Sequence, residues 1–271
     1  MNPMVRKELN LRMRERRGWI LPTLYLIAMG ATVVFAYYIV TSERTAREGL
    51  QGATVGATTF LTLSYAQLTL LLLLVPVFSA GSLTIEKEQR TLAALITSLL
   101  RPREIWFGKF SASLLFVGLL LCTGLPIMAL ALSLGGVGLV ELLFTVLTTL
   151  LIIATISALG LYCSATFRRS VHSTAVSYAA VILLSVITLI VFLLLYSHWN
   201  STHPGVPESQ IPRVLRIPLY LNPYYFLTMG FGVAANISRG EWLICLAVYA
   251  TIAVSFMALT WRAIDHSGEQ L

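Results

Sequence analysis

The sequence predicts an all-α membrane protein with six membrane-spanning helices. Of its 271 residues, 57% are hydrophobic and 11% are charged, whereas a soluble domain is roughly 45–50% apolar and about 25% charged. The mean hydropathy of +0.80 also excludes a water-soluble globule. Six uncharged apolar stretches reach the roughly 20 residues that a helix needs to cross a hydrocarbon core. They lack the period-2 alternation of a transmembrane β-barrel, so we expect helices.

The predicted spans cover most of the chain. They are Trp19–Val40, Val55–Ser79, Phe110–Leu134, Leu142–Thr166, Thr174–Tyr196 and Trp242–Trp261. We therefore expect one transmembrane domain over residues 19–261, preceded by residues 1–18 and followed by a cytoplasmic tail at 262–271. No polar stretch is long enough to hold a soluble catalytic domain.

The positions of Lys and Arg predict the orientation. The formal net charge is +7, from 19 basic and 12 acidic residues. With the N-terminus inside, 14 of the 19 bases fall on cytoplasmic segments, and outer bases and acids balance. Positive charge favours the cytoplasmic side. We therefore expect a multi-pass protein of the cell inner membrane with both termini in the cytoplasm, and no nucleic-acid partner.

The first 18 residues carry six bases and a broad apolar helical face, which Glu8 and Arg12 interrupt. This pattern predicts an amphipathic helix lying in the cytoplasmic interface before the first span. A disordered basic anchor is the alternative.

The segment from Gly81 to Lys109, between the second and third spans, predicts a short amphipathic cytoplasmic helix at about residues 90–100. Its apolar side chains follow i, i+3, i+4, i+7 spacing: Leu92, Leu95, Ile96 and Leu99. Charges cluster at both ends, and Pro102 is expected to end the helix. Such a helix suits docking into a groove of a soluble partner. From spacing alone, a solvated loop helix packed on its own bundle remains equally open.

The long outer segment before the last span also contains apolar sequence. Residues 221–237, LNPYYFLTMGFGVAANI, are too short and too interrupted by Gly and Pro to cross the membrane. We expect a re-entrant hairpin at about residues 215–238 that dips into the outer leaflet. A plain extracellular cap is the alternative.

Several kinds of chemistry are missing from the sequence. No span carries Asp, Glu, Lys, Arg or His near its middle, which argues against proton or sodium coupling, although neutral oxygen ligands for sodium stay open. HExxH, GxSxG and GxxxxGK motifs are absent, and neither the histidines nor the three cysteines have metal-ligand spacing. We therefore expect a non-enzyme that binds no cofactor or metal. An active transporter of this kind takes its energy from another polypeptide.

The second span carries a polar stripe at 4-3-4 spacing, which places its members on one helical face. The stripe consists of Thr58, Thr62, Tyr65 and Thr69. It could line a substrate path, or it could bond neighbouring helices together.

These features together resemble a type-2 ATP-binding-cassette (ABC) permease, the membrane subunit of many bacterial exporters. The most specific stretch begins with Glu86-x-Glu88-Gln89-Arg90-Thr91-Leu92, continues with Leu95-Ile96-Thr97-Ser98, and ends with Arg101-Pro102-Arg103-Glu104-Ile105-x-x-Gly108-Lys109. It is similar to the family's acidic pair, Gly-Thr-Leu, Leu-rich helix, Pro and Arg pair, and closing Gly-Lys. Arg90 stands in place of the family's usual Gly. Asn222-Pro223 sits where the family often has a turn in its outer hairpin.

The resemblance implies that two permeases and two ATPases form an exporter, with ATP and Mg on the ATPases and the permeases meeting along spans one and five. It implies an ATPase-facing set: Glu86, Glu88, Arg90, Thr91, Leu92, Leu95, Thr97, Ser98, Arg101 and Arg103. The candidate substrate path comprises Thr58, Thr62, Tyr65, Thr69, Asn222, Pro223 and Tyr224. The rival functions are an ATP-independent carrier or channel, a membrane scaffold for assembly of another complex, and an intramembrane enzyme, which the missing catalytic groups disfavour.

Overall fold

The computed structural model describes residues 17–41, 52–89, 102–133, 135–203, 212–232 and 239–269. All regular elements in these ranges are helical. In chain order they are α2 (Arg17–Thr41), α4 (Gly52–Ala80), α5 (Thr84–Glu88), α7 (Pro102–Ser133), α8 (Leu139–Thr166), α9 (Ser170–Ile182), the π-helix η1 (Leu183–Ile187), α10 (Thr188–Thr202), the 3-10 helix η3 (Arg213–Arg216), α11 (Ile217–Tyr220), α12 (Pro223–Gly232) and α13 (Arg239–Glu269).

The described residues contain six helical segments long and apolar enough to cross a membrane. They confirm the six spans predicted from the sequence. The second segment, Gly56–Glu88, continues past α4 into α5, and the fifth, Ser170–Thr202, combines α9, η1 and α10. The predicted coupling helix at about residues 90–100 lies outside the described part. The predicted interfacial helix at residues 1–18 also lies outside it, except for Arg17 and Gly18, which begin α2.

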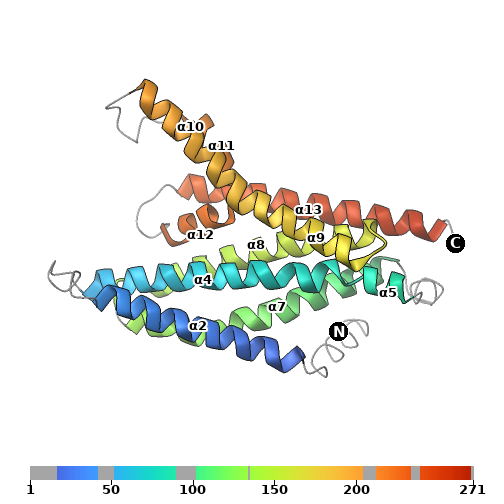
Figure 1. Cartoon of the computed structure of the whole chain (residues 1–271), viewed down its shortest axis with the longest axis horizontal. Helices are drawn as coiled ribbons and strands as arrows, with labels where there is room; N and C mark the ends of the chain where they lie inside the picture. The colour runs from blue at the N-terminus through green and yellow to red at the C-terminus, as the bar shows by residue number, and fades with distance from the viewer. Residues whose placement is uncertain are drawn as a thin grey trace.

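Helices α4 and α8 form the centre of the bundle. Helices α2 and α7 pack on one side of this pair, and α9 and α13 on the other (Figure 1). The short helix α12 packs against α8, α4 and α13, near the end of the bundle opposite to α5 and the C-terminus (Figure 1). This arrangement places Glu86 and Glu88 of α5 at the end of the bundle opposite to the candidate path residues of α12.

The core is built from apolar residues of the central helices together with α12. Phe60 of α4, Ile152 of α8 and Phe226 of α12 are fully buried. By contrast, α2 and α10 keep large apolar side chains exposed, among them Phe35 and Leu194. A membrane protein can expose such faces because lipid or another membrane helix covers them.

Two glycines turn the chain between α7 and α8. Gly135 and Gly136 have φ angles of +88° and +80°, a backbone region that residues with a side chain rarely adopt. Helix α8 then begins with the carboxylate of Glu141 accepting a hydrogen bond from the amide of Gly138 at 3.0 Å. This bond satisfies one of the free amides at the helix start.

Helix α7 begins earlier than the predicted third span. Pro102 is its first residue, whereas the sequence placed the start of the span at Phe110. Proline is tolerated in the first turn because that position needs no backbone donor. The helix therefore extends beyond the apolar stretch and carries Lys109 into the region around α5.

Candidate functional site

The structure describes three residues of the predicted ATPase-facing set. Glu86 and Glu88 lie in α5, and Arg103 lies in the first turn of α7, where its side chain is not described. The remaining members lie outside the described residues: Arg90, Thr91, Leu92, Leu95, Thr97, Ser98 and Arg101. The described part of the site therefore consists of α5 and the beginning of α7, the two helices on either side of residues 90–101.

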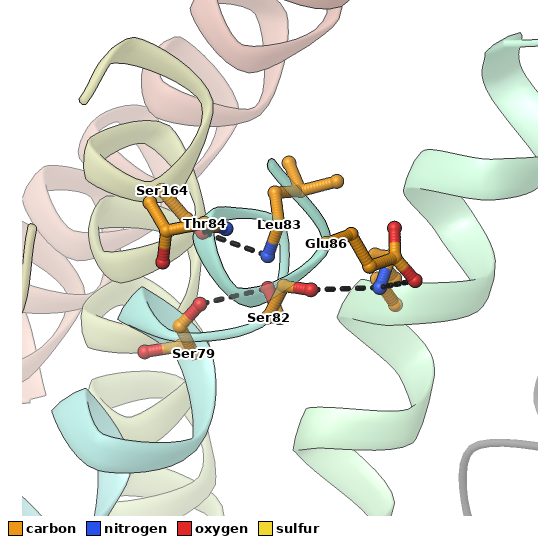
Figure 2. Close-up of polar contacts among 7 residues, drawn as sticks. Ser79, Ser82, Leu83, Thr84, Glu86 and Ser164 are labelled. Atoms are coloured by element: carbon orange, nitrogen blue, oxygen red, sulfur yellow. Dashed lines mark hydrogen bonds and ion pairs between the residues drawn. The ribbon is translucent and has the colours of Figure 1, made fainter. Parts of the chain in front are cut away.

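A buried ion pair joins the two ends of the predicted coupling segment. Lys109 is 1% exposed, and its ammonium donates to the carboxylate of Glu86 at 2.9 Å and to the carbonyl of Ser82 at 2.7 Å. Figure 2 shows Glu86 directed toward α7, with Ser164 on the opposite side of α5. A buried charge requires such partners because desolvation is costly. The pair thus fastens α5 to α7 on either side of residues 90–101.

Ser164 of α8 holds the beginning of α5. Its hydroxyl oxygen accepts hydrogen bonds from the amides of Leu83 at 2.8 Å and Thr84 at 3.0 Å (Figure 2). These amides are among the free donors at a helix N-terminus, and the N-cap residue Leu83 provides no side-chain cap for them. A side chain from a distant span therefore performs the capping.

Two further residues of α5 bind the turn between α8 and α9. The ammonium of Lys87 donates to the carbonyls of Ser164 at 3.0 Å and Phe167 at 3.1 Å, and also to the carbonyl of Ala165. The carboxylate of Glu88 accepts hydrogen bonds from the amide and the hydroxyl of Ser170 at 2.7 and 2.9 Å. Both side chains are thus engaged within the chain.

At the other end, the polar stripe of α4 meets α12. The hydroxyls of Tyr65 and Thr228 share a hydrogen bond of 2.7 Å, and those of Thr69 and Tyr224 share one of 2.9 Å. The structure therefore brings together Tyr65, Thr69 and Tyr224 of the candidate path. Thr58, Thr62 and Thr69 remain exposed on α4, with Thr62 and Thr69 each donating to a carbonyl one turn earlier.

Asn222 links the start of α12 to the fifth span. Its side-chain oxygen accepts hydrogen bonds from the amides of Tyr224 at 2.9 Å and Tyr225 at 3.2 Å. This is the geometry of a helix N-cap, and Pro223 occupies the following position, which proline favours. The amide nitrogen of Asn222 donates to the carbonyl of Ser185 at 2.7 Å and to the hydroxyl of Thr188 at 3.0 Å.

An ion pair fastens η3 and α12 to the last span. Arg216 donates to one oxygen of Glu241 at 2.8 Å, and the hydroxyl of Tyr225 donates to the other at 2.8 Å. Glu241 lies in the first turn of α13, where a negative charge interacts favourably with the helix dipole. The elements η3, α12 and α13 therefore meet at one carboxylate.

Comparison with known proteins decides the family. A family model described as an ABC-2 family transporter protein matches residues 3–264. The chain belongs to the ABC-2 family. It is accordingly an ABC transporter permease, a non-catalytic membrane subunit, and the predicted resemblance is confirmed. The comparison with curated proteins gives no match.

Membership of the family settles the broad partner class. ABC-2 permeases pair with an ATPase and typically bind no cofactor themselves. Within the described ranges, no group of three or more His, Cys, Asp or Glu could hold a metal ion.

Sequence reasoning missed several residues that organise the permease. Lys87 and Ser164 were not predicted to contact one another, and η1 was expected to be ordinary helix. Two signals were present in the sequence. Lys87 lies between Glu86 and Glu88 at the end of an apolar span, and Ser164 closes a row of small residues in the fourth span. Neither signal identifies the residue that is contacted, because the contacting residues are far apart along the chain.

Proposed function

We propose that this permease is the membrane half of an ABC exporter and is driven by a separate cytoplasmic ATPase that holds ATP and Mg. The observation that carries the proposal is the buried pair between Glu86 and Lys109. It fixes both ends of the segment containing Leu92, Leu95 and Leu99, so an ATPase docked on this segment would push against the bundle. A segment whose two ends are fixed to the membrane helices transmits its displacement to them, whereas a loosely attached loop would move without displacing them.

The orientation of the permease follows from its charges. Four bases lie at the α5 end of the bundle: Lys87 in α5, Lys109 bonded to α5, and Arg168 and Arg169 in the turn after α8. We assign this end to the cytoplasm because positive charge accumulates there. Both termini are then cytoplasmic, and α11 and α12 belong to a re-entrant hairpin at the outer leaflet. The burial of Phe226 and Leu227 within the bundle supports a helix that dips inward rather than an exposed cap.

A second permease copy completes the substrate path. The exposed apolar faces of α2 and of the α9–α10 span suit contact with another membrane helix, and Trp19, Phe35 and Leu194 are among the most exposed large side chains there. We place the path between the copies along Thr58, Thr62, Tyr65, Thr69, Asn222, Pro223 and Tyr224. The exposed hydroxyls of α4 favour this placement, because polar groups facing a cavity cost less than polar groups facing lipid.

The first experiment is a pull-down of the tagged permease from its native membranes in detergent, with stoichiometric partners identified by mass. We expect a soluble partner of about 25–35 kDa that carries a GxxxxGK motif, together with a second permease chain. A purified permease that gives substrate flux in liposomes without ATP and without such a partner would instead be a carrier or channel. A permease whose stoichiometric partners lack an ATPase and which gives no flux would be a scaffold.

The docking segment is tested by a substitution at Leu95. Leu95→Asp places a charge on the apolar face and should abolish co-purification of the ATPase while the permease remains in the membrane. Leu95→Met conserves volume and apolarity and should retain the ATPase. Equal recovery of the ATPase with both variants would refute docking through this face.

A further inference from the structure

The adjacent residues Lys87 and Glu88 bind opposite sides of one turn. Lys87 donates to carbonyls at the end of α8, and Glu88 accepts from the first residue of α9, Ser170. The turn between these helices spans residues 167–169. Two consecutive side chains of α5 therefore hold the end of the fourth span and the beginning of the fifth.

The signs of the two charges match the two helix ends. The last carbonyls of an α-helix lack partners and carry partial negative charge, which a lysine ammonium complements. The first amides carry partial positive charge, which a carboxylate complements. The residue before α9, Arg169, provides no side-chain cap, so Glu88 supplies one from another element. Exchanging the two charges would reverse both interactions.

Further hydrogen bonds hold α5 and the start of α9 to the neighbouring helices. The hydroxyl of Ser173 in α9 donates to the carbonyl of Ala80 at the end of α4 at 2.9 Å. The Ser164 hydroxyl holds the start of α5, and the Glu86–Lys109 pair holds its next turn to α7. Helix α5 is thus fastened to three spans immediately before the predicted docking segment begins.

Within one copy, few side chains of the fifth span are buried. In α9, η1 and α10 together, the buried residues are Ser173, Ser177, Val181 and Thr188. Three of these four lie in α9, the part closest to the turn. Beyond the turn, hydrogen bonds from Tyr178 to the carbonyl of Leu73 and from Asn222 to Ser185 and Thr188 hold the span to this copy. A displacement of the turn therefore works against few buried apolar contacts within one copy.

We propose that Lys87 and Glu88 are positioning residues that make α5 and the α8–α9 turn move as one body. The inference rests on the proposed function, since the movement originates in an ATPase docked on residues 90–101. Displacement of that segment then reaches the fourth and fifth spans directly through the two side chains. The fifth span is the one we place against the second permease copy, so its movement opens or closes the path.

The test measures distances between spin labels in the permease–ATPase complex in lipid nanodiscs. The exposed native cysteine Cys122 is replaced by Ser, and cysteines for labelling are placed at the exposed positions Ile20, Ile85 and Val171. Labelled permease is mixed with excess unlabelled permease so that each complex carries one labelled copy. Distances from position 171 to 85 and from 171 to 20 are recorded with and without ATP.

In the wild-type background, we expect ATP to leave the 85–171 distance unchanged and to shift the 20–171 distance. A clear ATP-dependent change in the 85–171 distance would overturn the inference, because α5 and the turn would then move separately. This measurement needs no substitution at Lys87 or Glu88, so it stands even where a variant fails to fold.

Substitutions then test the side chains themselves. Lys87→Met, at a position outside the ATPase-facing set, should broaden the 85–171 distance distribution and abolish the ATP-dependent shift at 20–171 while the ATPase remains bound and hydrolyses ATP. Glu88→Ala should abolish the shift as well, and it should broaden the 85–171 distribution already in the permease without ATPase, which weaker docking would not do. Glu88→Gln keeps an oxygen that accepts both bonds from Ser170 and should preserve the shift. Arg168→Met removes an exposed charge from the same turn and should also preserve it.

The outcomes separate the inference from the function on which it rests. A wild-type-like shift in Lys87→Met and Glu88→Ala would refute the positioning role while leaving the exporter intact. Loss of the shift in Arg168→Met to the same extent would also refute it, because charge alone would then explain the effect. Absence of a bound ATPase from the wild-type permease would refute the proposed function and the inference with it.

Discussion

Asn222 donates a hydrogen bond from its side-chain amide to the backbone carbonyl of Ser185 at 2.7 Å. Ser185 lies inside η1, the π-helical turn of the fifth span. A π turn interrupts the regular i→i−4 bonding of an α-helix, and such turns frequently occur at functional sites. The same side chain caps α12. One buried asparagine therefore connects α12 to the π-helical turn of the fifth span.

The two roles of Asn222 can be separated by substitution. Asn222→Ala removes the cap and the donor, and we expect a loss of about 2 kcal/mol from one N-cap and one buried hydrogen bond. Asn222→Ser keeps a capping oxygen but is too short to reach Ser185, and it should lose about 1 kcal/mol. Thermal unfolding of the purified permease in detergent measures both. Equal losses would show that the bond to Ser185 adds nothing to stability.

For the buried pair of Glu86 and Lys109, we expect a single substitution to destabilise the permease more than substitution of both residues. Lys109→Met leaves the Glu86 carboxylate at a mostly buried position without its ammonium partner, and we expect a loss of about 3 kcal/mol. Adding Glu86→Gln removes the stranded charge and should recover most of that loss. Folded yield and thermal stability of the three proteins provide the measurement. A double variant as unstable as Lys109→Met would contradict the ion-pair explanation.

Gly160 of α8 lies where α4 approaches closely. A Cβ atom at this position would lie 2.0 Å from the Ser79 hydroxyl and 2.9 Å from the Ser79 Cβ. Gly160→Ala should therefore destabilise the permease by about 1–3 kcal/mol through overpacking. Adding Ser79→Gly removes both clashing atoms and should restore part of the stability.

Gly118 of α7 provides the matched control for this substitution. A Cβ atom there meets no atom within 4 Å. Gly118→Ala should be neutral or stabilising by up to about 1 kcal/mol, because alanine favours a helix interior. Similar losses at Gly118 and Gly160 in thermal unfolding would show that close helix approach does not explain the requirement for glycine.

The Glu241 carboxylate is expected to hold the outer segment on the last span. Glu241→Ala removes the partner of both Arg216 and Tyr225, and we expect a loss of about 1–2 kcal/mol. Glu241→Gln retains the ability to accept from one or both donors and should lose less. Proteolysis of the membrane-embedded permease, followed at cleavage sites in the outer segment, measures the release of this contact. Identical protection in Glu241→Ala and the wild type would be inconsistent with this role.

Much of the fold was predictable because membrane insertion depends on local composition. Each span is an uninterrupted apolar stretch, such as residues 142–166, and the transfer of such a stretch into lipid does not require knowledge of its neighbours. The boundaries were less accurate because polar residues can continue a helix beyond the membrane. Lys109 illustrates this, since it lies inside α7 although the predicted span began after it.

The candidate site was predicted only in outline. Hydroxyl residues at 4-3-4 spacing indicated a polar face on α4, but the sequence left open whether the face lines a path or bonds another helix. The structure places Tyr65 and Thr69 in hydrogen bonds to α12, while Thr58 and Thr62 stay exposed. Which of these roles governs transport remains a prediction, to be tested with the path residues named above.

The sequence by itself determined the membrane class, the six spans and the family pattern around residues 86–109. Each of these depends on residue types at fixed spacings along the chain. Only the tertiary structure decided that Lys87 and Glu88 bind the two ends of the α8–α9 turn, and that Asn222 reaches Ser185. A polar side chain in a helical bundle bonds whichever unpaired group helix packing brings within reach. That packing is a property of the whole bundle rather than of any one segment.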